Sequence, residues 1–448
     1  MELVSLLGIV IGLVLLMFLA FKGCNIIWLA PVCAMVVAIM SGYSLLDAYL
    51  GDYMTGMANY VLSWFPAFFL GAVYGKVMDM TGSARSLADW LVKLIGSKFA
   101  VAAVVIPCLL MTYGGISLFV VVFVIYPMGY AIYRAADLPR TLLPGAIAFG
   151  AFGITMTAIP GTPQIQNLIP CNYYGTTAMA GLPMSIAAII IVGIPGYVYL
   201  EWRARQAHAK GLHFTPDPKH KEVDHSEKAL PSWHWLSGLI PLIVVVLMLN
   251  LFPKILMNMG GPELSSTQAI VIALLCGIAI CLIMNASQFQ IFLSAINEGA
   301  VGSMGAIMNT ACAVGFGSVV KVVPGFALLT NAALNMPGSI LFSEAVAVNL
   351  LAGATGSASG GMSIALEALA PKYMEMAGTL GINVEYLHRI ASLSSGGLDT
   401  LPHNGAVLTL LAVSNCTHKE SYLDICVTTC IIPVVGSLLL ALVWGIFL

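Results

Sequence analysis

Charged residues are scarce in this chain of 448 residues: only 8% are charged, whereas 59% are hydrophobic. A soluble domain carries about 25% charged residues, so the shortage excludes a soluble fold. Several apolar runs are about as long as a helix that crosses the hydrocarbon core, roughly 20 residues. They occupy 24–42, 183–200, 236–252, 267–284 and 425–447. None shows the alternation of a membrane β-barrel strand. We therefore expect an all-α polytopic membrane protein.

Four further absences exclude other classes. Residues 1–3 contain no basic residue, and 3–21 is long enough to span a membrane, so we expect a membrane helix there and not a cleaved signal. The ten cysteines include no CxxC pair and lie mostly in apolar runs, so we interpret them as core residues. The net charge of −2 gives no reason to expect a nucleic-acid partner. No nucleophile, metal-ligand or cofactor motif indicates an enzyme, a bound metal or a cofactor.

One long polar segment, 203–234, divides the chain. It holds six of the 18 Lys and Arg residues and five of the eight His, whose spacings fit no compact metal site. The halves on either side are related by a shift of 242 residues, which aligns their small landmarks and apolar runs. The aligned pairs are Gly75 with Gly317, Gly114 with Gly356, Ser117 with Ser359, Pro160 with Pro402, 24–42 with 266–284, and 183–200 with 425–442. This register indicates an internal duplication. The predicted units are repeats at 1–202 and 235–448, joined by the linker 203–234.

The distribution of basic residues predicts the topology. We place the linker in the cytoplasm and interpret 99–134 as a re-entrant hairpin. Each repeat then has five transmembrane helices plus one hairpin, the second repeat is inverted, and both termini lie outside. Of the 18 basic residues, 14 fall inside, and the four outside are Lys254, Lys321, Lys372 and Arg389. If 99–134 crossed fully, this bias would be lost. The second hairpin is predicted at 340–374, with Glu344 and Glu367 at the membrane interface. The expected location is the inner (plasma) membrane.

Four polar, glycine-rich segments interrupt the apolar runs, two in each half: 112–117, 159–167, 354–361 and 394–405. Irregular backbone survives in a bilayer only where protein or water satisfies it. Helices that begin at such breaks point their N-termini inward and favour an anion, while freed carbonyls can hold a cation. Glycine-rich stretches can also be close-packing surfaces, but their recurrence in both halves favours a binding site. The predicted substrate-binding residues are Gly114, Gly115, Ser117, Thr162, Gln164, Asn167, Gly356, Ser357, Ser359, Thr400 and Asn404.

Asp399 and His403 form the only close acid–histidine pair deep in an apolar context. An ionisable residue within a membrane is a functional hypothesis by default, so we predict that this pair handles the coupling ion. Asp399 could instead pair with Arg389 or cap a helix. The first half has Thr157 and Gly161 at the corresponding positions. The predicted site is therefore asymmetric in its titratable groups.

At these motifs the chain resembles the gluconate permease family of gluconate:proton symporters, within the ion transporter superfamily. The motifs are Tyr113-Gly114-Gly115-Ile116-Ser117, residues 354–358 and residues 396–405. The resemblance covers most of the chain and implies uptake of organic acids, usually with protons. The superfamily implies inverted repeats, two hairpins, a homodimer and an elevator motion. Gluconate carriers tend to have proline where this chain has Ser117, followed by a segment with an acid that 118–124 lacks. The fourth motif is closest to hydroxybutyrate permease-like members.

We therefore predict ion-coupled symport of a small organic anion, such as a short-chain hydroxy- or keto-monocarboxylate similar to 3-hydroxybutyrate. The coupling ion in the leading prediction is H⁺, with Na⁺ as the alternative. Three more functions fit the same features: a sodium-coupled mono- or dicarboxylate carrier, a carrier of gluconate-type sugar acids, and an anion channel. A channel needs a continuous pore, whereas inverted repeats with paired hairpins favour alternating access.

Overall fold

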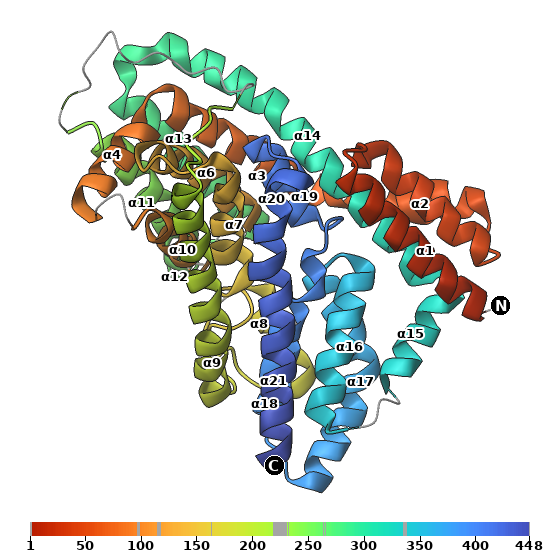
Figure 1. Ribbon diagram of the computed structural model, residues 1–448. Coiled ribbons are helices and arrows are strands. Elements are labelled where there is room, and N and C mark those ends of the chain that lie inside the picture. The colour runs from red at the N-terminus through yellow and green to blue at the C-terminus, as the bar shows by residue number, and fades with distance from the viewer. Residues whose placement is uncertain are drawn as a thin grey trace.

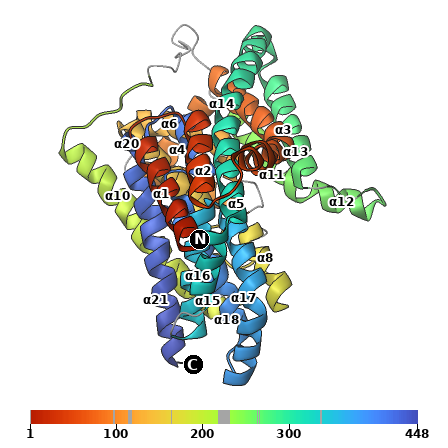
Figure 2. The ribbon, with the colours of Figure 1, turned by 90° about the vertical axis from the view of Figure 1, so that its right-hand side faces the viewer.

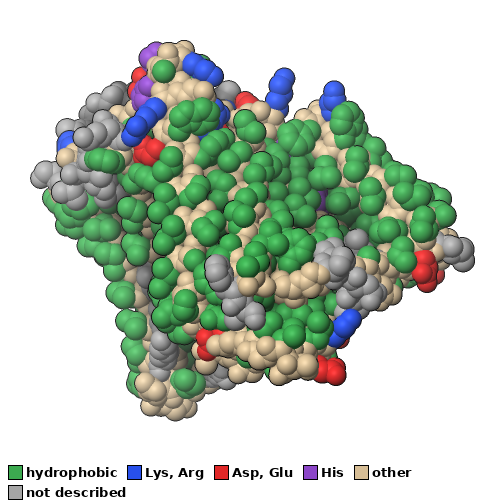
Figure 3. All heavy atoms as spheres, turned by 60° about the horizontal axis from the view of Figure 1, so that its bottom comes forward, with side chains coloured by type: hydrophobic (Ala, Val, Ile, Leu, Met, Phe, Trp, Pro, Cys, Tyr) green, Lys and Arg blue, Asp and Glu red, His purple; other side chains and the backbone are tan. Residues whose placement is uncertain are grey.

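A computed structural model describes residues 2–95, 99–113, 118–162, 164–217, 231, 233–262, 264, 266–334 and 338–447. Every regular element within these ranges is helical, which confirms the all-α prediction. Five helical segments are long and apolar enough to cross a membrane: Glu2–Phe21, Asp47–Met80, Leu182–Ala209, Ala286–Val322 and His418–Ile446. The face in Figure 3 is largely hydrophobic, with charged side chains near its margins. These features fit a polytopic membrane protein.

The first half contains ten α-helices among the described residues. They are α1 (Glu2–Phe21), α2 (Ile26–Met40), α3 (Met54–Met80), α4 (Ser83–Ile95), α5 (Ala100–Tyr113), α6 (Leu118–Ala135), α7 (Leu143–Ala148), α8 (Ile165–Tyr174), α9 (Leu182–Ala188) and α10 (Ile194–Ala209). Wider π-helical turns precede α3 at Asp47–Tyr53, follow α7 at Phe149–Gly153 and join α9 to α10 at Ile189–Gly193. The helix α10 ends at Ala209, so it continues past residue 203, where the linker was predicted to start.

The second half contains eleven α-helices in the part of the chain that is described. They are α11 (Leu236–Asn250), α12 (Phe252–Asn258), α13 (Ser266–Met284), α14 (Phe289–Val322), α15 (Pro324–Leu334), α16 (Ile340–Thr355), α17 (Ala358–Leu380), α18 (Val384–Ser395), α19 (Gly405–Ser414), α20 (His418–Cys426) and α21 (Ile432–Phe447). A π-helical segment, Val427–Ile431, joins α20 to α21. It resembles the junction between α9 and α10.

Helix boundaries in the two halves follow the register found in the sequence. The shift of 242 residues places α2 on α13, α5 on α16, α6 on α17 and α8 on α19, with bounds that agree within about three residues. Corresponding helices also make corresponding contacts: α1 packs on α2 as α11 packs on α13, and α5 packs on α6 as α16 packs on α17. The agreement supports the duplication, whereas the inverted orientation of the repeats stays a prediction.

The longest helix, α14, runs along the upper edge of the molecule and packs on α2 and α3 (Figure 1). Figures 1 and 2 both place α16, α17, α18 and α21 toward the end that carries the C-terminus. Glycines let α3 and α14 approach closely. A Cβ atom at Gly299 would lie 2.7 Å from the Cα atom of Val73, so any side chain there would force these two helices apart.

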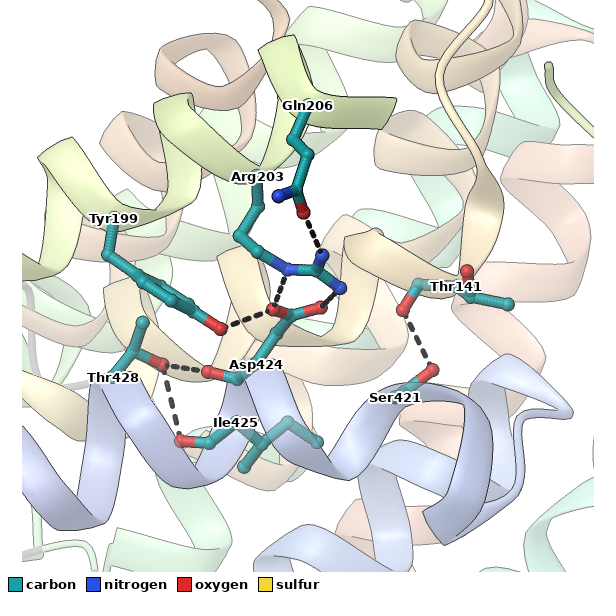
Figure 4. Close-up of polar contacts among 8 residues, drawn as sticks. All are labelled: Thr141, Tyr199, Arg203, Gln206, Ser421, Asp424, Ile425 and Thr428. Carbon is teal, nitrogen blue, oxygen red and sulfur yellow. Dashed lines mark hydrogen bonds and ion pairs between the residues drawn. The ribbon is translucent and has the colours of Figure 1, made fainter. Parts of the chain in front are cut away.

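A partly buried ion pair joins the two halves (Figure 4). Arg203 of α10 holds both carboxylate oxygens of Asp424 of α20, at 2.6 Å through Nε and 3.2 Å through Nη2. Tyr199 donates a further hydrogen bond to Asp424 at 2.8 Å, and Gln206 accepts one from Arg203 at 3.1 Å. The side chain of Asp424 is 1% exposed, so removal of Arg203 would leave a buried carboxylate without its ion-pair partner and should be strongly destabilising.

The start of the linker is docked on the helices. His213 Nδ1 lies 2.7 Å from Asp137 Oδ2, and the backbone N–H of Phe214 donates to Asp137 Oδ1 at 3.0 Å. The ring of Phe214 packs edge-on against Tyr130 of α6, with centroids 5.0 Å apart. Asn415, directly after α19, donates to Asp217 Oδ2 at 2.8 Å. Residues 213–217 thus connect the ends of α6 and α19, and we refer to them as the linker strap.

Candidate functional site

Four helices begin at the wall of one cavity of about 250 Å³. Their first residues all line it: Leu118 of α6, Ile165 of α8, Ala358 of α17 and Gly405 of α19. The register pairs α6 with α17 and α8 with α19, so each half contributes two of the four. The first turn of a helix has unpaired N–H groups and the positive end of the helix dipole. Four such ends directed at one cavity make it suited to an anion.

Asn404 connects two of these helix starts. Its Oδ1 atom accepts hydrogen bonds from the N–H groups of Ala406 at 2.7 Å and Val407 at 3.1 Å, which caps α19. Its Nδ2 group donates to the carbonyl oxygen of Gly356 at 3.1 Å, at the break between α16 and α17. Asparagine is among the best N-cap residues, so the local sequence explains why α19 begins here. The same side chain fixes the distance between the two breaks.

The break before α17 depends on glycine and serine. Gly356 ends α16 with a φ of 62°, a left-handed conformation that favours glycine. A Cβ atom there would also lie only 2.8 Å from His403 Nε2. Ser357 then caps α17 by accepting the N–H of Gly360 at 3.1 Å. The sequence Gly356-Ser357 therefore ends one helix and starts the next within two residues.

The predicted substrate-binding residues divide into three groups. Gln164, Gly356, Ser357, Ser359 and Asn404 line the cavity, as does the predicted coupling residue Asp399. Thr162, Asn167, Thr400 and His403 are buried near the breaks and are not among the lining residues. Gly114, Gly115 and Ser117 lie outside the described residues. The structure thus brings residues from three of the four breaks to one cavity.

Asn167 is buried, and its side chain is used within the protein. Its Nδ2 group donates to the carbonyl oxygens of Thr162 and Ala178, both at 2.9 Å, and its Oδ1 atom lies 3.2 Å from His388 Nε2. Thr176 contacts the other nitrogen of that ring at 2.7 Å. These contacts give Asn167 the geometry of a residue that supports the backbone around the break before α8.

Thr400 is held in a comparable way. Its hydroxyl group donates to the carbonyl oxygen of Thr429 at 2.8 Å, and its own carbonyl oxygen accepts a hydrogen bond from Tyr422 at 3.0 Å. Both partners lie near the junction of α20 and α21. Thr400 therefore anchors the break before α19 to that junction.

Asp399 and His403 are buried and have hydrogen-bonding capacity to spare. Asp399 is 8% exposed, and its Oδ1 atom makes no hydrogen bond to the described residues. His403 is 1% exposed, and neither of its ring nitrogens has a hydrogen-bond partner of normal geometry in the described part of the chain. Unpaired buried polar atoms are costly. Their presence beside the cavity is the arrangement expected of groups that meet a ligand or a coupling ion.

Arg389, which the charge count assigned to the outer side of the membrane, is buried within the protein. Its side chain is 0% exposed and donates to the carbonyl oxygens of Ala180 at 2.8 Å and Thr157 at 3.4 Å. The contacts of the described residues include no ion pair with Asp399, so that alternative has no support. Thr157 itself lines the cavity. A buried positive charge therefore lies directly behind the cavity wall.

Glu344 was also misplaced by the sequence. It is fully buried on α16 and accepts a hydrogen bond from Tyr174 of α8, whereas Glu367 is exposed. Burial of the carboxylate became possible because a tyrosine far away in the sequence lies beside it.

The aromatic part of the cavity wall was not predicted from the sequence either. It consists of Tyr60, Trp64, Phe119 and Phe152. Arg389 had a signal, since it lies only five residues before the last break.

The site shows the chemistry of binding more than that of a reaction. Helix starts, hydroxyl groups, amides and one carboxylate surround a space with an aromatic wall. Within the described ranges, no group of three or more His, Cys, Asp or Glu side chains is placed to hold a metal ion.

The chain is similar to known permeases over nearly its whole length. The family described as GntP family permease matches residues 1–445. A protein of Bacillus subtilis (strain 168), named uncharacterized transporter YxjC, is 39% identical over 454 residues, which cover 95% of this chain and 96% of that protein. The Gnt-II system L-idonate transporter of Escherichia coli (strain K12) is 28% identical over 243 residues, or 53% of this chain and 52% of that protein.

Proposed function

Because the chain belongs to the GntP family of permeases, we propose that it is a secondary active transporter that carries a small organic anion together with a cation. Transport by a permease of the organic acid type, and not catalysis, is what the family and the relatives indicate. The observation that carries the proposal is the convergence of four helix N-termini on one cavity. A carboxylate there would meet the positive ends of these helices and could accept hydrogen bonds from first-turn N–H groups other than those of Gly360, Ala406 and Val407, which the side chains of Ser357 and Asn404 already cap.

The proposed substrate is a short-chain hydroxy- or keto-monocarboxylate similar to 3-hydroxybutyrate. A cavity of about 250 Å³ is smaller than the usual range for drug-sized ligands, about 300–1,000 Å³. Its aromatic residues would pack against a short carbon chain, while Ser357, Ser359 and Asn404 could meet the oxygens. The second candidate is a sugar acid, because one relative is named as an L-idonate transporter. More hydroxyl groups would need more polar partners than this wall offers.

The proposed cation is H⁺, carried by Asp399 or His403. Both side chains are buried beside the cavity, and each can take up a proton when an anion binds nearby. Na⁺ is the alternative, held by carbonyl oxygens at the breaks. We also propose two inverted repeats, an elevator motion and a dimer. The shared register of the helices supports the duplication, and the family resemblance supports the rest.

Reconstitution into liposomes tests the proposal. We would measure counterflow for a panel of carboxylates that includes 3-hydroxybutyrate and gluconate, with and without Na⁺ at two pH values. A symporter accumulates the labelled anion against its gradient, a channel gives only passive conductance, and absence of any flux with all the anions would contradict transport of this class.

The coupling residues need a separate comparison. Asp399→Asn and His403→Ala should each impair uptake driven by a pH gradient more than counterflow, because counterflow needs binding and movement but no net proton transfer. Glu367→Gln, which removes an exposed carboxylate on α17, is the matched control and should change neither rate. If both variants still accumulate substrate at the wild-type level under a pH gradient alone, neither residue carries the proton, and Na⁺ coupling becomes the better explanation.

A further inference from the structure

A second cavity, of about 270 Å³, lies further along the same helices. It contains both charged and uncharged polar side chains, including Lys76, Asp79 and Glu298. Lys76 and Glu298 form an ion pair at 3.5 Å across α3 and α14. Asp217 of the linker strap also lines this cavity. The cavity therefore lies toward the face of the molecule that carries the linker.

The two cavities are neighbours along one groove. Both are lined by α3, α6, α14 and α19, and on each helix the two sets of lining residues lie a short distance apart. In each of the following pairs, the first residue lines the candidate site and the second lines the second cavity. The pairs are Trp64 and Ala72 on α3, Phe119 and Phe123 on α6, Thr310 and Asn309 on α14, and Ala406 and Ala412 on α19. Four residues of α6 correspond to about 6 Å of helix. The layer that separates the cavities is thus only about one helical turn thick at α6.

This layer is mostly apolar, and the hydroxyl groups that it contains at Thr310 and Thr409 are hydrogen-bonded to each other at 2.8 Å. Phe68, Ala72, Phe123 and Ile307 form a small buried cluster of their own, apart from the main core. The ring of Phe68 lies between those of Phe119 and Phe123, with centroid distances of 5.0 Å and 5.8 Å. Phe119 faces the candidate site and Phe123 faces the second cavity. Phe68 is fully buried and contacts both of these rings, so it is part of the layer between the two cavities.

We propose that the second cavity is an aqueous vestibule of the transport path and that Phe68, Phe123 and Ile307 form the gate between it and the candidate site. A dry apolar layer blocks ions because neither water nor any polar group replaces their hydration shell. A layer one turn thick with polar cavities on both sides has the form of a gate. Two unrelated packing voids would not be expected to share four lining helices or to lie on opposite sides of one apolar cluster.

Thiol accessibility tests this gate without knowledge of the substrate or the coupling ion. Gly302→Cys reports on the vestibule, since a Cβ atom at Gly302 meets no other atom within 4 Å. Ser359→Cys reports on the candidate site, and Lys210→Cys marks the linker face. Each variant is compared with the parent protein in proteoliposomes, because the ten native cysteines are free thiols. A charged, membrane-impermeant thiol reagent is added to the linker face only, with no substrate present.

We expect the cysteine at Gly302 to react from the linker face and the cysteine at Ser359 to react slowly from that face. Phe68→Ala should speed the reaction at Ser359 about tenfold or more, because loss of the ring opens space for water between two polar cavities. Phe65→Ala is the matched control: it removes a partly exposed ring one turn away on α3 that lines neither cavity.

Two results would overturn the proposal. One is a cysteine at Gly302 that does not react from the linker face although the one at Lys210 does. The other is an unchanged rate at Ser359 in both Phe68→Ala and Phe123→Ala. The second gate variant is included in case Phe68→Ala alone disturbs folding, which size-exclusion chromatography would reveal. A carrier with no measurable flux would contradict the proposed function but leave this accessibility result intact, so the two failures can be told apart.

Discussion

Two substitutions of Arg389, to glutamine and to lysine, distinguish the effect of its charge on anion affinity from the effect of its hydrogen bonds on stability. The guanidinium is buried, and its Nη1 atom lies 3.4 Å from the carbonyl oxygen of Thr157, whose residue lines the cavity. A bound anion would thus lie on the order of 8 Å from the positive charge. At an effective dielectric constant of about 20, the attraction is about 2 kcal/mol, or about 30-fold in affinity. Arg389→Gln should lose this attraction, whereas Arg389→Lys should keep most of it.

The hydrogen bonds make a different contribution. Arg389 satisfies carbonyl oxygens of two irregular segments, at Thr157 and at Ala178 and Ala180. The carbonyl oxygens of Thr157 and Ala178 keep hydrogen bonds from Ser392 and Asn167, so the loss falls mainly on that of Ala180. A buried carbonyl group left without a partner costs about 1–3 kcal/mol. Lysine cannot reproduce the forked geometry of arginine. Both variants should therefore be less stable than the parent, by similar amounts.

The assay measures apparent affinity in counterflow with the best carboxylate of the panel, together with thermal stability in detergent. We expect both variants to lose a similar amount of stability but to differ in affinity for the anion. The affinity of Arg389→Lys should stay within about fivefold of the parent, and that of Arg389→Gln should be about 30-fold weaker. If the folded fraction of Arg389→Gln binds the anion as tightly as the parent, the charge does not act on the site, and Arg389 serves only to support the backbone.

Three further predictions concern single contacts. Asn404→Ala should cost about 1 kcal/mol of stability through loss of the cap on α19 and should weaken substrate counterflow, whereas Asn404→Ser, which can still cap, should lose less of both. Gly361→Val should prevent a monodisperse protein on size-exclusion chromatography, because its Cβ atom would lie 2.3 Å from the backbone of α16; Gly378→Val on the same helix has open space and should behave as the parent. The hydrogen bond from His213 lowers the pKa of Asp137, so docking of the linker strap is favoured above the ordinary pKa of an aspartate and is lost as pH falls through the lowered one. Protection against hydrogen exchange at 213–217, corrected for the intrinsic exchange rate at each pH, should fall in acid for the parent, and in Asp137→Asn it should be low already at neutral pH.

Residues at the breaks could be predicted because their signals are local. Asn404 and Ser357 are good capping residues that interrupt apolar runs next to glycine, and a break within a membrane must be satisfied by protein or water. Both residues lie in the second half, so their meeting at one cavity does not follow from the duplication; it is the fold that brings the breaks before α17 and α19 together. The helices α16 and α17 begin and end close to the predicted segments.

The orientation of apolar helices could not be predicted. A soluble helix shows which side faces the core by its polar stripe, but most of α6 and the middle of α3, residues 64–75, are apolar on all sides, and lipid and protein interior select similar residues. Nothing in the sequence therefore distinguishes Phe119, which faces the cavity, from Phe65, which does not. The side chain of Asn167 was expected to face the ligand, yet it supports the backbone of Thr162 and Ala178. Its partners come from segments whose proximity only the fold reveals.

The two buried charges were misjudged for a related reason. Hydropathy assigns a charged residue to the nearest interface because its cost in the bilayer is assumed to be unrelieved. In Arg389 the cost is reduced by backbone carbonyl oxygens at two irregular segments, and in Glu344 by the hydroxyl group of Tyr174. Irregular backbone in a membrane thus creates sites where a charge can be buried. A charged residue within a few positions of such a break is therefore better treated as a candidate interior residue.

The charges around the candidate site lead to a requirement for a cation. Arg389 is the buried positive charge behind the wall, the exposed Lys321 lies near the start of α17, and one titratable acid, Asp399, lies in the wall. With Asp399 ionised, a bound carboxylate would place two negative charges against one positive charge in a poorly hydrated space, which is costly. With Asp399 protonated, the loaded site carries one charge of each sign. The empty site with Asp399 ionised is balanced in the same way, so the two forms best suited to cross the membrane differ by one anion and one proton. In Asp399→Asn the side chain is neutral at every pH, and the loaded site stays balanced without a proton. We therefore expect this variant to exchange substrate by counterflow at both pH values while a pH gradient no longer drives accumulation.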